Sequence, residues 1–578
     1  MKKFQKNKPL RSRVVAYSTP EKHWRFKLVP LALAVAAAAI ALRLVQIQIL
    51  DSEKYQKLAR NQYTKKYVVR APRGLIYDRN NTPLALNQPC FDLGVDRRFV
   101  KDIPATSRRL ASVLKANPHE IQTKIRKASR YVQLGRQLDE KTASQVMFMD
   151  LPGVQLMQLS ERVYPLNEKL APVLGFVNIE GSGASGLELA CDRYLAGKDG
   201  ATELQRDAKG NPLMTVSNTN TGEESGSDVI LTIDHVMQII AEEELAKATS
   251  KFNAKGGSVT IINPNTGEIL AMASAPGFDA NRANYYPADN WRIRPITDIF
   301  EPGSTYKIVT MTAALSEGVK QLDDIIYCEN GKYRMFGEEI NDTKKLGWLT
   351  FDNVFVYSSN IGAAKIAQEI GRNKMFIASR NFGFGNRTGI ELPGEVSGIL
   401  KKPIAWSKFS LAAISFGHEV GVTPLQMAMA YAAVANGGKL MKPAIIKEIR
   451  SKENKTLYRF KAQNIRKVMT PETAKKLTAI LEQAVEKGTG ELAQLPDLKI
   501  AGKTGTAQKL ADSRRGYSDT HYMASFAGFY PSEQAKIVIL VTLDEPNPVH
   551  SGGHAAAPVF RAILLRILDF YNKSLDQI

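Results

Sequence analysis

The stretch Glu301-Pro302-Gly303-Ser304-Thr305-Tyr306-Lys307 places a hydroxyl nucleophile and an amine three residues apart. The apolar residues that follow Pro302 and Gly303 predict a mostly buried helix that begins near Ser304. Residues i and i+3 project from the same face of a helix, so we expect Lys307 to reach the Ser304 hydroxyl. Lysine can remove a serine proton only if burial or a neighbouring cation lowers its pKa from about 10.4.

Two further motifs follow at long range. Ser358-Ser359-Asn360 begins 54 residues after Ser304, and Lys503-Thr504-Gly505-Thr506 begins 145 residues after Ser358. Taken alone, the first motif also fits a serine that caps a helix and a lysine that is exposed to solvent. The ordered set S-x-x-K, S-x-N, K-T-G resembles the set shared by penicillin-binding proteins and class A β-lactamases. Its order makes a chance match improbable.

The second motif supplies groups for proton transfer and for substrate binding. Ser358 is expected to carry the serine proton onward to the leaving amine, and Asn360 to hold a substrate amide by hydrogen bonds. Lys503, from the third motif, is the candidate cation that lowers the pKa of Lys307.

The third motif is predicted to be a strand, because Leu498-Lys499-Ile500-Ala501 leads into it. Gly505 has no side chain, so a substrate backbone can lie along the strand edge. Backbone N–H groups of Ser304 and Thr506 are expected to form the oxyanion hole. Loss of one such donor costs about 3–4 kcal/mol in the barrier.

Signatures outside the three motifs extend the resemblance to one family. Arg73 to Ala85 is similar to the RGxIxDRNGxxLA signature of class B penicillin-binding proteins, with Asn81 in place of glycine. Gly186-Leu187-Glu188 matches the later GLE signature, and 388–395 and 422–426 resemble the transpeptidase domain. The resemblance covers residues 28–578. It implies a penicillin-recognising serine transpeptidase domain on an elongated N-terminal pedestal of the dimerisation type.

The residues themselves favour an α+β fold. A helix is predicted over 232–248 and a hairpin over 258–273, and strands over 524–529 and 537–542 precede a final helix over 558–571. Strands at both ends of a helical centre favour an antiparallel sheet covered by helices. The polar run 217–227 is interpreted as a linker. The predicted domains are a basic tail (1–27), a transmembrane anchor (28–50), the pedestal (51–225) and the transpeptidase domain (226–578).

An apolar segment near the N-terminus predicts a membrane anchor. Leu28 to Leu50 holds one charge, Arg43, and as a helix it would span about 35 Å. Nine Lys or Arg precede it against Glu21 alone, which predicts a cytoplasmic N-terminus and an extracytoplasmic catalytic domain. A cleaved signal peptide is the competing interpretation. The resemblance implies an uncleaved, single-pass anchor in the bacterial inner membrane.

Charge and metal-ligating residues narrow the function classes. The 578-residue chain carries a net charge of +21, of which +8 lies in the first 27 residues. It has no basic helix with interleaved aromatics and no zinc-finger spacing, so we predict no nucleic-acid binding. Cys90, Cys191 and Cys328 are expected to be isolated buried thiols. No cofactor is expected, and we expect no metal at His550 and His554.

The resemblance implies a peptidoglycan D,D-transpeptidase. Ser304 would attack the carbonyl between two terminal D-alanines of a stem peptide, and β-lactam antibiotics would acylate it. Lys503, Thr504 and Thr506 would bind the donor carboxylate. An amine of a neighbouring stem peptide would then resolve the acyl-enzyme.

Asparagine at position 360 favours septal synthesis during division, the penicillin-binding protein 3 type, because elongation-specific relatives usually have S-x-D there. The implied partner is a polytopic membrane glycosyltransferase of the shape, elongation, division and sporulation family, contacted through residues 28–50 and the pedestal. Four alternatives stay open: an elongation-specific transpeptidase, a β-lactamase, a β-lactam sensor and a non-catalytic divisome scaffold. A β-lactamase is usually shorter and lacks an anchor.

Overall fold

The computed structural model describes residues 24–206, 212–215, 222–510, 516–572 and 575. The chain forms two compact units. The first comprises Met1–Val69 and Gly200–Gly222, and the second comprises Arg70–Asp199 and Glu223–Ile578.

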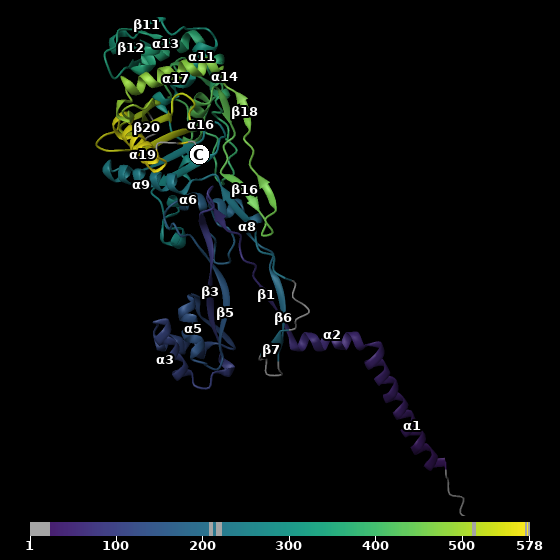
Figure 1. Ribbon diagram of the computed structural model, residues 1–578. Coiled ribbons are helices and arrows are strands. Elements are labelled where there is room, and N and C mark those ends of the chain that lie inside the picture. The colour runs from purple at the N-terminus through teal and green to yellow at the C-terminus, as the bar shows by residue number, and fades with distance from the viewer. Residues whose placement is uncertain (1–23, 207–211, 216–221, 511–515, 573–574, 576–578) are drawn as a thin grey trace, which may run out of the picture. The chain divides into compact units, whose positions relative to one another are not determined.

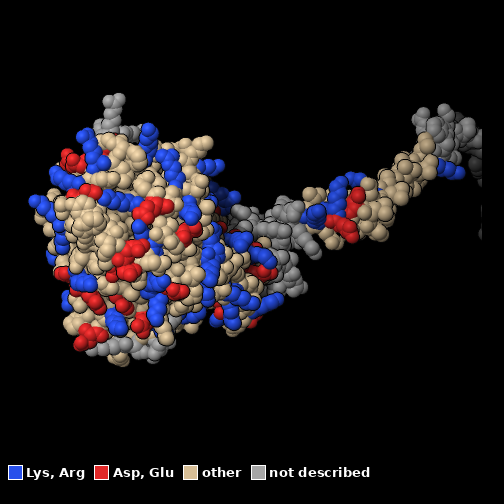
Figure 2. Space-filling model, turned by 90° about the horizontal axis from the view of Figure 1, so that it is seen from above, with Lys and Arg blue, Asp and Glu red and all other residues tan. Residues whose placement is uncertain are grey.

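The first unit contains the apolar segment. Lys27–Leu50 is long and apolar enough to cross a membrane, with a mean hydropathy of 2.4 and none of it buried. In Figure 2 the middle of the corresponding helix is tan, whereas the next helix carries blue and red side chains. The length and composition of Lys27–Leu50 fit the membrane-spanning segment that the sequence predicted. The elements of this unit are α1 (Trp24–Val45), a π-helical turn (Gln46–Leu50), α2 (Ser52–Tyr63), and a three-stranded sheet of β1 (Thr64–Val69), β6 (Gly200–Arg206) and β7 (Pro212–Thr215).

The second unit is built around a five-stranded antiparallel sheet in the order β10-β9-β21-β20-β19. The third motif lies on β19, which is the edge strand. This architecture confirms the predicted α+β fold. The strands are β9 (Gly256–Ile262), β10 (Ile269–Ala275), β19 (Ala501–Leu510), β20 (Tyr517–Tyr530) and β21 (Ile537–Asp544).

Helices cover both faces of this sheet. One face packs on α9 (His235–Lys251) and α19 (Ala557–Phe570), which share a buried apolar cluster with the strands. The other face packs on α16 (Pro424–Ala435), an almost entirely buried helix that belongs to the larger core. Figure 1 shows α9 and α19 beside β20, with α11, α13 and α14 gathered at one end of the unit. These three helices are α11 (Lys307–Ser316), α13 (Asn360–Ile370) and α14 (Arg372–Asn381).

The boundaries of the predicted helices are set by local capping. The first predicted helix starts at His235 rather than at residue 232, because the Asp234 carboxylate accepts the backbone N–H groups of Val236 and Met237. Thr232 instead belongs to the turn that follows a strand, where its hydroxyl donates to the carbonyl of Ile269. The sequence pattern predicted the helix correctly, but the capping side chain of Asp234 determines the residue at which it starts.

The N-terminal part of the second unit contains long strands. A seven-stranded sheet runs in the order β17-β16-β8-β2-β3-β4, with β5 also paired to β3. The strand β3 alone has 14 residues, and three helices accompany it. These elements are β2 (Ile76–Tyr77), β3 (Pro83–Asp96), β4 (Tyr131–Leu138), β5 (Val154–Val163), β8 (Asp228–Leu231), β16 (Ile446–Arg450), β17 (Thr456–Arg459), α3 (Ile103–Leu114), α4 (Pro118–Lys127) and α5 (Glu140–Phe148).

The two N-terminal signatures meet in a buried ion-pair network. Glu188 is fully buried and accepts from Arg73 Nε and from Arg162 Nε, both at 2.7 Å. A buried carboxylate needs such partners, because an isolated buried charge is costly. The RG and GLE signatures therefore have a structural purpose in this chain.

The predicted linker is only partly within the described residues. Residues 217–221 lie outside them, but Gly226 N–H donates to the carbonyl of Pro72 and Ser227 N–H to that of Tyr194. The end of the polar run is therefore fixed in the second unit, directly before β8 enters the seven-stranded sheet.

Candidate active site

The first motif forms a tight turn at the start of α11. A 3₁₀ turn covers Gly303–Tyr306, and α11 begins at Lys307, three residues later than Ser304. Residues i and i+3 eclipse one another in a 3₁₀ turn, so Ser304 and Lys307 still lie on the same side. Gly303 has φ +54, and a Cβ there would lie 2.9 Å from the carbonyl oxygen of Thr506. Only glycine lets this turn approach β19 so closely.

Lys307 joins the first motif to the second. Its side chain is fully buried, and Nζ donates to the Ser358 carbonyl at 2.7 Å, to Asn360 Oδ1 at 2.8 Å and to Ser358 Oγ at 3.2 Å. Within the described residues the Ser304 hydroxyl makes no hydrogen bond, so Lys307 is engaged with the second motif rather than with the nucleophile.

Burial shifts the protonation of Lys307. Loss of solvent lowers the pKa of Lys307 to about 7, against the opposing charge of Asp342. A lysine with a pKa near 7 is about half neutral at pH 7, and the neutral amine can accept a proton. The sequence had named Lys503 as the candidate cation that lowers this pKa, but burial is what lowers it.

The second motif is held by an acidic residue that sequence analysis missed. Ser358 has φ +64, and the turn it makes leads into α13. The carboxylate of Asp342 accepts from Ser359 Oγ and from Asn360 N–H, both at 2.6 Å. No spacing rule marks Asp342, because it reaches the motif from the end of a small hairpin, β12 (Lys332–Met335) and β13 (Glu338–Asn341).

The third motif packs edge-on against the first. Gly505 lies so close to the turn that a Cβ would be 2.7 Å from the Pro302 carbonyl oxygen. Thr506 Oγ1 accepts the N–H of Gly552 at 2.9 Å, which ties β19 to the short helix α18 (Gly552–Ala555). Within the described residues β19 pairs with β20 alone, so its other edge faces the Ser304 turn. The structure therefore brings the three motifs together.

Lys503 is the second buried lysine of the site. It is 1% exposed, and burial together with the positive charge of Lys307 holds the pKa of Lys503 well below its ordinary value. Its Nζ donates to Thr489 Oγ1 at 3.1 Å, and Thr489 Oγ1 lies 2.7 Å from Thr504 Oγ1. Thr489 is a second residue that the motif analysis did not find, because it precedes the motif by fourteen residues on another element.

A cluster of ionisable and aromatic side chains borders the nucleophile turn. Glu301 Oε1 accepts from the backbone N–H of Glu419 at 2.9 Å and from the Tyr517 hydroxyl at 3.3 Å. His418 Nδ1 lies 3.4 Å from Glu301 Oε2, and its ring packs edge-on against Tyr517. Burial raises the pKa of Glu301 to about 7 and, with the charge of Lys307, lowers that of His418 to about 4. The imidazole is thus neutral at physiological pH.

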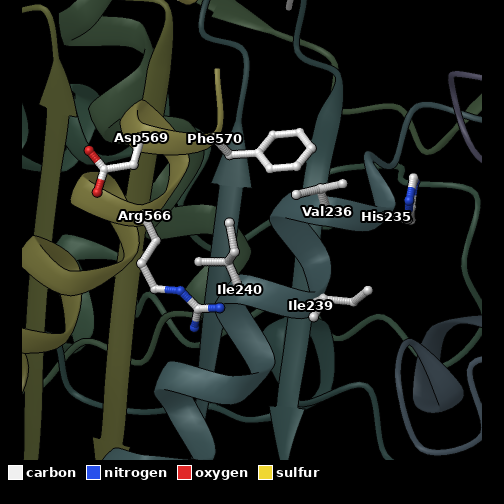
Figure 3. A pocket seen from close by; sticks show the side chains of 7 residues that line it. All are labelled: His235, Val236, Ile239, Ile240, Arg566, Asp569 and Phe570. Carbon is white, nitrogen blue, oxygen red and sulfur yellow. The ribbon is translucent and has the colours of Figure 1, made fainter. Parts of the chain in front are cut away.

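Other candidate sites lie apart from these motifs. A groove of about 500 Å³ lies between α9 and α19, and none of its lining residues belongs to a motif. Figure 3 shows Val236, Ile239 and Ile240 on one side of it and Arg566 and Phe570 on the other. Apolar side chains dominate its wall, and it offers no activated nucleophile.

The cysteines and the paired histidines have local structural roles. Cys90, Cys191 and Cys328 are buried and free, as predicted. His550 stacks on Tyr522 with ring centroids 4.2 Å apart, and His554 Nδ1 lies 2.8 Å from Ser551 Oγ. Among the described residues no group of three metal-ligating side chains is found.

Comparisons with known proteins agree with this site. Residues 257–565 match the Penicillin binding protein transpeptidase domain, and residues 68–231 match the Penicillin-binding Protein dimerisation domain. The chain is 34% identical over 526 residues to "Stage V sporulation protein D" of Bacillus subtilis, covering 90% of this chain and 81% of the relative. It is 30% identical over 558 residues to "Peptidoglycan D,D-transpeptidase FtsI" of Escherichia coli K12, covering 95% and 92%.

A solved structure has the same fold. Penicillin binding protein 3 of Mycobacterium tuberculosis, complexed with aztreonam, aligns with a TM-score of 0.70 and 27% identity, over 88% of this chain and 97% of that one. Both domain families, the relatives and the fold thus agree with the three assembled motifs. The chain belongs to the class B penicillin-binding proteins of the FtsI and penicillin-binding protein 3 type, and it is a serine-type peptidoglycan D,D-transpeptidase.

Proposed function

We propose that Ser304 is the nucleophile and Lys307 the base of cross-linking. Ser304 Oγ bonds to the carbonyl carbon between two terminal D-alanines, and the peptide C–N bond breaks. The serine proton passes to Lys307 and then, through the Ser358 hydroxyl, to the departing D-alanine nitrogen. An amine of a second stem peptide attacks the ester, and Ser304 recovers its proton.

The remaining motif residues bind substrate in this proposal. Asn360 holds the donor amide, and the cation of Lys503 with the hydroxyls of Thr504 and Thr506 binds the donor carboxylate. The donor backbone runs along the edge of β19, where Gly505 leaves room. The N–H groups of Ser304 and Thr506 stabilise the oxyanion.

One observation carries the proposal: the fully buried Lys307, hydrogen-bonded to Ser358 and Asn360 beside the Ser304 turn, has a pKa of about 7. Burying a lysine amine that has no hydrogen bond to a carboxylate costs folding free energy. A buried lysine beside a half-buried serine is therefore expected to have a function, and general base is the function that fits.

The experiment is intact mass spectrometry of residues 51–578 after incubation with benzylpenicillin, beside the Ser304→Ala variant. We expect one stable adduct on the native chain and none on the variant, since the serine opens the β-lactam ring and keeps the fragment as an ester. Rapid release of the adduct would favour a β-lactamase. An adduct on both proteins, or on neither, would remove Ser304 from the proposed role.

The proposal extends to location and partners. The protein acts at the division septum, anchored by residues 28–50, with residues 1–27 cytoplasmic and residues 51–225 and 226–578 outside. Asn360 is the residue expected at this position of division enzymes, and it supports a role in septal peptidoglycan synthesis. The proposed partner is a polytopic membrane glycosyltransferase. β-Lactams acylate the same serine.

Replacement of the chromosomal copy by Ser304→Ala tests the septal role. We expect filaments without completed septa, because cross-linking fails only at division. Rounded cells would instead indicate elongation, and normal division would indicate a scaffold or a redundant enzyme. Fluorescence of a tagged full chain at mid-cell is the accompanying measurement.

A further inference from the structure

Lys503 is a buried amine whose hydrogen-bond partners are neutral. In the described part of the chain it forms no ion pair, and its shortest hydrogen bond is to Thr489 Oγ1 at 3.1 Å. The carbonyl oxygen and the Oγ1 of Thr504 follow, both at 3.5 Å. Thr489 is thus the side chain that fixes where the Lys503 amine lies.

The hydroxyl oxygens of Thr489 and Thr504 lie 2.7 Å apart, and either hydroxyl can be the donor of this pair. The Lys503 nitrogen donates to Thr489 Oγ1, which leaves the one hydrogen of the Thr489 hydroxyl for Thr504 Oγ1. Thr504 keeps its own hydrogen for a ligand only when Thr489 is the donor, so that donation runs from Lys503 to Thr489 to Thr504.

Thr489 is held in place from a separate part of the fold. It lies in the loop between α17 (Pro471–Glu486) and a 3₁₀ turn (Glu491–Ala493). The short helix α18 (Gly552–Ala555) packs against it, since a Cβ on Gly553 would lie 2.7 Å from the Thr489 carbonyl oxygen. The same helix donates from Gly552 N–H to Thr506 Oγ1. One short helix therefore contacts both Thr489 and Thr506 of the strand.

We infer that Thr489 is a positioning residue for carboxylate recognition: its hydroxyl fixes Lys503 and turns the Thr504 hydroxyl hydrogen toward the carboxylate of a stem peptide or β-lactam. The inference rests on the proposed function, in which Lys503 and Thr504 bind that carboxylate. Thr489 itself does not touch the ligand. It decides whether Thr504 offers the ligand a hydrogen or an oxygen lone pair.

The test compares Thr489→Val with Thr489→Ser against two ligands, benzylpenicillin and its methyl ester. Valine keeps the shape and removes the hydroxyl, whereas serine keeps the hydroxyl. The measured quantity is the second-order rate constant for acylation of the full chain in detergent, followed by intact mass. The methyl ester lacks the charged carboxylate but presents the same β-lactam carbonyl.

We expect Thr489→Val to lower the rate constant for benzylpenicillin about tenfold, the usual effect of a hydrogen bond to a charged group. The constant for the methyl ester should change less than about twofold, and Thr489→Ser should restore the benzylpenicillin value to within about threefold. In a Thr504→Val background, adding Thr489→Val should not lower the rate constant further, because the hydroxyl that Thr489 orients is already absent.

Equal losses for both ligands would overturn the inference and leave Thr489 a purely structural residue. Unchanged acylation of Thr489→Val by benzylpenicillin would also overturn it. If the native chain is not acylated by either ligand, the proposed function fails first, and the inference falls with it. If Thr489→Val does not fold, Thr489→Ala, which also lacks the hydroxyl, takes its place against the same two ligands.

Discussion

At the scale of single residues, we expect Lys307 to set the pH dependence of Ser304 acylation. Its pKa is lowered to about 7 by burial, so the neutral base is lost as pH falls below 7. We expect the acylation rate of Ser304 to fall about tenfold per pH unit below that point and to level off just above it. Stopped-flow acylation with a fluorescent penicillin between pH 5 and 8 measures this.

Asp342 provides the matched variant for that profile. Its charge raises the pKa of Lys307, so Asp342→Asn should move the midpoint of the profile to lower pH. The variant also weakens the hydrogen bonds from Ser359 Oγ and Asn360 N–H, which should lower the maximal acylation rate at high pH. A profile that is flat, or a midpoint that does not move, would contradict the role of Lys307 as the base.

At the scale of elements, the site depends on how closely β19 packs on the Ser304 turn. A Cβ at Gly505 would lie 2.7 Å from the Pro302 carbonyl oxygen and 3.0 Å from Thr305 Cγ2. Gly505→Ala should separate strand and turn, costing about 1–3 kcal/mol of stability and more than tenfold in acylation. Chemical unfolding and the benzylpenicillin rate constant measure the two effects.

Gly277→Ala is the control, because the nearest atom to its Cβ would be 3.9 Å away. It should leave both quantities unchanged. If Gly505→Ala acylates at the native rate, the strand edge does not need to lie so close, and the proposed path of the substrate backbone is wrong.

At the scale of the whole molecule, Glu188 links two distant signatures. Glu188→Gln removes the countercharge of the buried Arg162 and one of the two carboxylates paired with Arg73, whose other partner is Asp192. We expect a loss of about 3–5 kcal/mol in the free energy of unfolding. The exposed pair of Lys198 and Glu224 gives the control, since Glu224→Gln should not move the unfolding midpoint. Equal midpoints for the two variants would show that the buried network is not a stabilising one.

The anchor is a second property of the whole chain. Deletion of residues 28–50 removes the apolar segment that lies within Lys27–Leu50. The full chain should sediment with membranes after a high-salt wash, whereas the deleted chain should stay in the supernatant. Sedimentation of both would mean that another surface holds the protein to the membrane.

The sequence by itself determined the α+β class, the positions of the main helices and strands, and the three motifs. These depend on local patterns, such as the continuous apolar run 537–541 in β21 and the serine and lysine three residues apart. It also predicted that Cys90, Cys191 and Cys328 are buried thiols, which the structure confirms.

Only the tertiary structure decided which residues support those motifs. Asp342 and Thr489 reach the site from a hairpin and a loop, and no spacing in the chain marks them. The pKa of Lys307 depends on burial by several elements at once, so no local pattern contains it. Sequence patterns record what each segment can do alone, whereas hydrogen bonding and desolvation depend on segments that meet only after folding.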